Sequence, residues 1–175
     1  MTSIRQELTF SVHGEEYAIE ILRVREVLEA LPLTRVPTTP ISIRGVVNIR
    51  GTVVPVVDLG LRFGLAELTI GRRTCIVVVD VIEDGATIAM GLLVDHVNQV
   101  IDLDDAMVEA VPAFGVHVRL DFLRGMGAVG EKLVMLLEVD RVLSTTDLRA
   151  AAEASVAVMD DLDAVAPPVV EGGAA

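Results

Sequence analysis

An internal repeat limits the possible folds of this 175-residue chain more than its composition does. The segment Arg44–Leu59 aligns on Arg124–Val139 without a gap, so that an Arg-Gly pair starts each copy and an acidic residue, Asp58 or Glu138, stands near each end. Each copy has the pattern of strand, tight turn, strand, acidic residue and short helix. A true repeat predicts two similar five-stranded barrels with a seam between them, whereas chance similarity of two valine-rich hairpins is the alternative.

Short apolar runs separated by turn signals fill most of the chain. Leu8, Phe10 and Val12 alternate with polar residues, as in a half-buried strand. Ile21, Val24 and Leu28 fit one face of a brief helical turn over residues 21–29. Further strand-like runs cover residues 53–57, 74–82, 87–94, 97–101, 116–123 and 132–139. About ten short strands without a long helix between them predict an antiparallel all-β fold, either a sandwich or small barrels.

Two segments depart from this pattern. Pro55 lies inside an apolar run and cannot donate to a ladder, so we expect it at a sheet edge or at a bulge. Residues 147–159 are rich in helix formers, and the stretch after Asp160 is acidic and alanine-rich. The expected organisation is one domain over residues 5–148, followed by a helical extension and a disordered acidic tail over 149–175.

The charge and the composition exclude several classes of function. A net charge of −12 disfavours binding to a phosphate backbone, and an aromatic content of 3% removes the stacking platforms for single-stranded nucleic acid. The first residues contain no secretory signal, and aspartates interrupt the apolar runs before they reach the length of a membrane helix. These features predict a cytoplasmic protein with no nucleic-acid partner and no direct insertion into the membrane.

The sequence proposes no catalytic or cofactor chemistry. His13, His96 and His117 lack the spacing of a metal site, and Cys75 lies in an apolar run, where a buried inert thiol is expected. The segment Gly125–Gly130 is a literal GxGxxG, but a strand-like run follows it instead of the helix that a dinucleotide site needs. We therefore interpret those glycines as permitting strand curvature, and we expect neither an enzyme, nor a cofactor, nor a metal.

The segment Ile43–Leu59, with Tyr17–Val27, Gly91–Val97 and Leu123–Gly127 in the same order, strongly resembles the CheW family of bacterial chemotaxis coupling proteins. The resemblance covers about residues 5–148. It implies two five-stranded SH3-like β-barrel subdomains with short helices. It also implies an adaptor that links the cytoplasmic hairpin of methyl-accepting chemoreceptors to the regulatory domain of the histidine kinase CheA, at membrane-associated receptor arrays. Two other functions stay open: an adaptor of a chemotaxis-like pathway that controls something other than swimming, and a β-barrel protein that binds a small ligand.

A receptor hairpin needs a groove with an apolar floor and a polar rim. We expect an apolar lining, a rim in which Glu26 orients Arg50 through a bidentate pair, and glycines that allow close backbone approach. The expected receptor-binding residues are Ile21, Val24, Glu26, Val27, Val36, Gly45, Asn48, Arg50 and Gly51. The kinase-binding residues stay unassigned, with Leu103–Val116 and Gly125–Val129 as two regions to consider.

Overall fold

The computed structural model describes residues 3–37, 39–83, 85–112, 120–143 and 153 of the chain. These residues form ten strands: β1 (Ile4–Val12), β2 (Glu15–Glu20), β3 (Val24–Glu29), β4 (Ile43–Ile49), β5 (Thr52–Asp58), β6 (Cys75–Glu83), β7 (Ala86–Val94), β8 (His96–Asp104), β9 (Leu123–Val129) and β10 (Lys132–Leu137). The helices that they form are single turns: η1 (Ile21–Arg23), α1 (Leu59–Arg62), η2 (Asp105–Met107), η3 (Leu120–Phe122) and α2 (Val139–Val142). The helix expected over 147–159 and the tail lie, apart from residue 153, outside the described residues.

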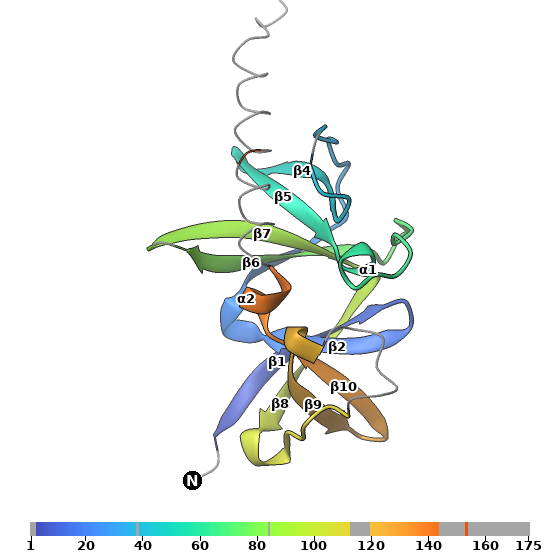
Figure 1. Ribbon diagram of the computed structural model, residues 1–175, viewed down its shortest axis with the longest axis vertical. Coiled ribbons are helices and arrows are strands. Elements are labelled where there is room, and N and C mark those ends of the chain that lie inside the picture. Colours follow the sequence, from blue (N-terminus) through green and yellow to red (C-terminus); the bar gives the residue numbers. More distant parts are fainter. Residues whose placement is uncertain (1–2, 38, 84, 113–119, 144–152, 154–175) are drawn as a thin grey trace, which may run out of the picture.

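The strands form two five-stranded sheets, so the expected all-β fold with two five-stranded units is confirmed. One sheet has the order β8-β1-β2-β10-β9 and the other the order β3-β6-β7-β5-β4. In Figure 1 they lie one above the other, with α2 between them. Each sheet is antiparallel except for one parallel pair, β2 with β10 and β5 with β7, which the antiparallel prediction missed.

The repeat is real, and its two copies share their strands between the sheets. The first copy, β1–β5, places β1 and β2 in one sheet and β3, β4 and β5 in the other. The second copy, β6–β10, places β6 and β7 in the sheet of β3, β4 and β5, and it places β8, β9 and β10 in the sheet of β1 and β2. The two copies therefore interlock, and neither sheet consists of one continuous stretch of chain.

Two local predictions were wrong. Only Ile21–Arg23 forms a helical turn, and the strand β3 begins directly after it. The spacing of Val24 and Leu28 fits a helix, but four residues is also an even number, so the two side chains lie on one face of a strand equally well. Of the strand expected over 116–123, residues 116–119 lie outside the described part, and Leu120–Phe122 form the turn η3.

Pro55 lies within an inner strand and not at the sheet edge or the bulge that we expected, since the bulge of the β4–β5 pair lies between Ile43 and Gly45. Its ladder partner is Val46, whose backbone N–H and carbonyl are both bonded to Thr34. The N–H that proline lacks would therefore point toward β7, and the β5–β7 ladder begins only at Val56. Pro55 is tolerated because the neighbouring strand requires no donor at that position.

The main core lies between the two sheets and is built largely from valine, leucine and isoleucine of both. All four aromatic residues of the described part belong to it. Their rings form a chain from Phe10 to Tyr17, Phe63 and Phe122, with centroids 6.3, 5.0 and 6.3 Å apart. Tyr17 is 1% exposed, and its burial raises the pKa of the phenol to about 12, with a smaller contribution from the charge of Glu15.

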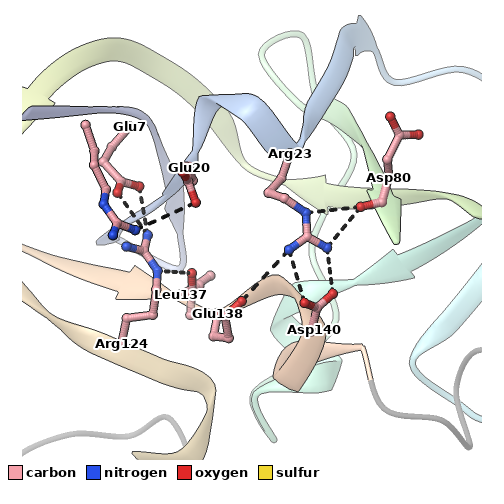
Figure 2. A network of polar contacts seen from close by, with 9 residues as sticks. Glu7, Glu20, Arg23, Asp80, Arg124, Leu137, Glu138 and Asp140 are labelled. Carbon is pink, nitrogen blue, oxygen red and sulfur yellow. Dashed lines mark hydrogen bonds and ion pairs between the residues drawn. The ribbon is translucent and has the colours of Figure 1, made fainter. Parts of the chain in front are cut away.

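Polar contacts join distant segments at the junction of the two sheets and within one of the sheets, as Figure 2 shows. Arg23, at the crossing from β2 to β3, donates to both carboxylate oxygens of Asp140 at 2.6 and 3.1 Å and to the carbonyl of Asp80 at 3.0 Å. The Asp140 carboxylate raises the pKa of the Arg23 guanidinium further. Arg124 donates to the fully buried Glu7 at 2.8 and 3.0 Å. Segments far apart in the chain are thus joined by charge-assisted hydrogen bonds.

Candidate functional site

The turn between β4 and β5 is a two-residue loop that presents Arg50. Ile49 pairs with Thr52, and the two residues between them, Arg50 and Gly51, have φ values of +52° and +85°. Such turns require positive φ at both central positions, which glycine adopts freely and arginine does not. The Asn48 side chain stabilises the loop by accepting the Gly51 N–H at 2.9 Å. The turn therefore leaves the Arg50 side chain 79% exposed.

Glu26, on β3 at the opposite edge of the same sheet, fixes the orientation of that arginine. Arg50 donates from Nη1 to Oε2 and from Nη2 to Oε1, at 3.1 Å each, so the expected bidentate pair is present. The Glu26 side chain is only 18% exposed. The planar fork matches the carboxylate, and it leaves the other N–H donors of Arg50 free to meet a partner.

A hollow of about 160 Å³ lies beneath this pair. Its lining residues come from β3, β4, β5, β6 and the β4–β5 turn: Arg25, Glu26, Ile49, Arg50, Thr52, Val54 and Val78. Val54 and Val78 are each 2% exposed and form an apolar floor. Arg25 pairs with Asp80 at 2.7 Å. The site therefore combines a charged rim with a small aliphatic floor, and we call it the Glu26–Arg50 hollow.

The structure brings together four of the nine expected receptor-binding residues: Glu26, Asn48, Arg50 and Gly51. Val27 follows Glu26 on a strand, so its side chain points to the opposite face of the sheet. Ile21 and Val24 are partly buried against the main core. These three residues therefore do not line the hollow.

Val36 and Gly45 pack against other parts of the same chain. Val36 is 7% exposed and packs with Val46 in a small cluster of its own. A Cβ at Gly45 would lie 2.6 Å from the carbonyl oxygen of Thr34, whose backbone bonds to Val46 at 2.8 and 2.9 Å. The lack of a side chain at Gly45 therefore admits a segment of its own chain, the backbone of Thr34.

Sequence reasoning missed Arg25, Ile49, Thr52, Val54 and Val78 as lining residues. Ile49 and Thr52 flank the Arg-Gly turn, and that position alone could have identified them. Arg25 could not be found in this way, because it is the extra residue of a bulge: Val24 pairs with Val79 and Glu26 pairs with Val78.

The dinucleotide motif is resolved as a strand and a turn. Gly125 and Gly127 lie in β9, the turn at Gly130 follows, and β10 comes next without a helix. A Cβ at Gly125 would lie 2.5 Å from Val108 Cγ1 and 2.9 Å from the Glu109 carbonyl oxygen. Gly125 therefore allows close approach of another segment of the chain, which is a different role from the strand curvature that we expected.

The described residues contain no group of three or more His, Cys, Asp or Glu that could hold a metal ion. Asp58 is fully buried and accepts hydrogen bonds from the Arg44 side chain at 2.7 Å and from the Leu61 and Leu68 N–H groups at 3.1 and 3.0 Å. Its oxygens are therefore occupied by the fold. Among the helices in this part of the chain, none is long and apolar enough to cross a membrane.

The fold and the Glu26–Arg50 hollow define a small two-sheet β protein with a charged hollow at its surface. A family model described as "CheW-like domain" matches residues 6–147, and the chain belongs to this family of chemotaxis scaffold proteins. It is 33% identical over 141 residues to the chemotaxis protein CheW of Klebsiella aerogenes, covering 81% of this chain and 82% of that protein.

A second relative and a solved structure agree with this membership. The chain is 32% identical over 147 residues to the chemotaxis protein CheW of Rhizobium meliloti, covering 84% of this chain and 92% of the relative. The crystal structure of the scaffolding protein TtCheW from Thermoanaerobacter tengcongensis matches with a TM-score of 0.73 and 28% identity, covering 83% of this chain and 91% of the other.

Proposed function

We propose that this protein is a non-catalytic adaptor that couples the cytoplasmic tips of chemoreceptors to the histidine kinase CheA in bacterial signalling arrays. It would act in the cytoplasm and be recruited to arrays at the membrane. Family membership supports the scaffold role, and the Glu26–Arg50 hollow supports a site for the receptor hairpin.

The observation that carries this proposal is the bidentate pair at the mouth of the hollow. A helical hairpin presents apolar side chains flanked by polar ones. Val54 and Val78 would meet the apolar side chains, and the free donors of Arg50 would meet a carboxylate or an amide of the receptor. Because Glu26 already orients Arg50, the arginine loses little conformational entropy on binding.

The expected receptor surface is accordingly narrower than the nine residues named from the sequence. We propose that Glu26 and Arg50 make the contact and that Asn48 and Gly51 shape the turn. Ile21 and Val24 would support the core beside the hollow, while Val36 and Gly45 would support the sheet that carries it.

For the kinase we propose a separate surface. The family resemblance implies that the CheA regulatory domain is itself a CheW-like module, and about 800 Å² per partner is enough for a specific interface. Gly125 lies in one of the two regions named from the sequence, and Val108 and Glu109 of the same chain fill the space beside it. The backbone of β9 at that point is therefore a weak choice for a kinase contact.

The test is co-sedimentation of the protein with a receptor cytoplasmic hairpin. Arg50→Ala removes a central charged anchor, which costs about 2 kcal/mol, or about thirtyfold in affinity. Arg50 is exposed, so the melting temperature should hardly change. Arg72→Ala is the matched control, because Arg72 is also an exposed arginine. Undiminished co-sedimentation of Arg50→Ala would remove the receptor site from this hollow.

A further inference from the structure

A second and larger groove, of about 810 Å³, opens at one end of the sheet that contains β1. Its wall is formed by residues of β1, β2, β8, β9 and β10 and the turns between them: Ser11, Gly14, Glu15, Glu16, His96, Asn98, Gln99, Val129, Glu131, Lys132 and Leu133. None of the receptor-binding residues expected from the sequence borders it. We call it the β2–β10 groove.

The groove opens where two parallel strands separate. β2 pairs with β10 only through Tyr17 with Met135 and Ala18 with Leu136. Toward Glu15 on one strand and Lys132 on the other the ladder is absent, and Figure 1 shows the β1–β2 and β9–β10 hairpins diverging there. The facing strand edges in this wedge are therefore available to an extended segment, which gains main-chain hydrogen bonds when it adds to such an edge.

This groove and the Glu26–Arg50 hollow lie at related positions in the two sheets, although the groove extends further, to β2. The strand orders of the two sheets correspond one to one, with β8 in the place of β3. Both of these edge strands have a bulge with one unpaired residue: Asn98 between Val97 and Gln99 in β8, and Arg25 between Val24 and Glu26 in β3. By this register, Gln99 replaces Glu26 in the second copy. The fold therefore provides a recess at this place twice, with different side chains around it.

The chemistry of the second recess differs from that of the first. The turn Gly130–Glu131 stands in place of Arg50–Gly51, so the exposed turn carries an acid instead of a base. Three carboxylates, Glu15, Glu16 and Glu131, face one ammonium group on Lys132. Within the described residues, Glu15, Glu131 and Lys132 form no ion pair or side-chain hydrogen bond, so these charges are not neutralised by the fold.

Polar and apolar contacts complete the recess. Asn98 donates to the Ser11 hydroxyl at 3.2 Å and to Glu16 at 3.0 Å, which fixes three side chains from neighbouring strands along its wall. Leu133 is 61% exposed beside them. An occupant would thus meet carboxylates, an ordered amide and one apolar side chain.

We propose that the β2–β10 groove binds an extended segment of a partner protein that carries alternating lysine or arginine and aliphatic residues. The segment would add to the free edge of β2 or β10, its cations facing Glu15 and Glu131 and an aliphatic side chain covering Leu133. This site is separate from the receptor site proposed above, and its test does not depend on that role.

The test uses the full chain and a fluorescent peptide, Lys-Val-Lys-Val-Lys, with Glu-Val-Glu-Val-Glu as its charge-reversed counterpart. Anisotropy should show binding of the basic peptide only, and amide chemical shifts should change at Glu15–Tyr17 and Lys132–Val134. The double variant Glu15→Gln, Glu131→Gln should weaken binding about tenfold, or about 1.4 kcal/mol, since it removes two exposed carboxylates that would face the cations of the peptide. Both residues are exposed, so the variant should fold normally.

Two further variants separate this site from the first. Lys132→Glu removes the one cation of the groove and should strengthen binding of the basic peptide. Arg50→Ala should leave that binding unchanged whether or not it abolishes receptor binding. Equal affinity for both peptides, unchanged affinity of the double variant, absence of binding, or shifts centred on the Glu26–Arg50 hollow would each overturn the proposal.

Discussion

Replacing Gly45 with alanine tests how the chain that follows β3 is fastened to β4. The new Cβ would lie 2.6 Å from the Thr34 carbonyl oxygen and 2.9 Å from its carbonyl carbon, so the Thr34 backbone must move. That movement strains or breaks the two bonds between Thr34 and Val46, of 2.8 and 2.9 Å. Overpacking costs about 1–3 kcal/mol, and each weakened backbone bond adds about 1 kcal/mol. We expect a loss of about 3–5 kcal/mol in the free energy of unfolding.

Urea unfolding followed by circular dichroism measures this loss directly. Gly71→Ala is the matched control, because no atom lies within 4 Å of a Cβ at Gly71 and its backbone needs no positive φ. Gly125→Ala should resemble Gly45→Ala, since its Cβ would meet Val108 and the Glu109 carbonyl. Equal midpoints for Gly45→Ala and Gly71→Ala would refute the reasoning. Loss of receptor binding by a fully stable Gly45→Ala would show that Gly45 contacts the receptor after all.

Two other predictions concern the core and the junction of the sheets. Tyr17 is the sole tyrosine of the chain, so tyrosinate absorbance should titrate near pH 12 in the folded protein, against about 10 when unfolded. Because the folded protein then holds the phenol proton more tightly, the contribution of Tyr17 to stability should be constant just below pH 10. It should fall by about 3 kcal/mol between pH 10 and 12, and Tyr17→Phe should remove this fall. Arg23→Met keeps the aliphatic stem but loses the hydrogen bonds to Asp140 and Asp80, so it should lower the free energy of unfolding by about 1–2 kcal/mol. The loss should be smaller in high salt, which screens the charges. An equal loss at all salt concentrations would contradict the charged nature of this contact.

The fold class was predictable because it depends on local signals. Alternating valines, two-residue turns and the Arg-Gly repeat all act within a few residues, and they indicated ten strands in two similar units. How the strands are shared between the sheets was not predictable. The crossing at Arg23 depends on contacts with Asp80 and Asp140, which are 57 and 117 residues away along the chain.

The candidate site was predictable in part for the same reason. The Asn48–Gly51 turn is a local motif, and the resemblance directed attention to Glu26 as its partner. The internal packing of Gly45 and Val36 was not predictable, because the sequence does not show whether a glycine or a valine contacts a partner or another segment of its own chain. Only the position of Thr34 against Gly45 distinguishes the two.

We propose that this chain links a chemoreceptor hairpin to the regulatory domain of CheA. The most direct measurement immobilises a receptor cytoplasmic hairpin and records how much CheA regulatory domain is retained with and without this protein. We predict that the kinase domain is retained only when the protein is present and that Arg50→Ala abolishes this retention while Arg72→Ala does not. Retention of the kinase domain without the protein, or full retention with Arg50→Ala, would contradict the account.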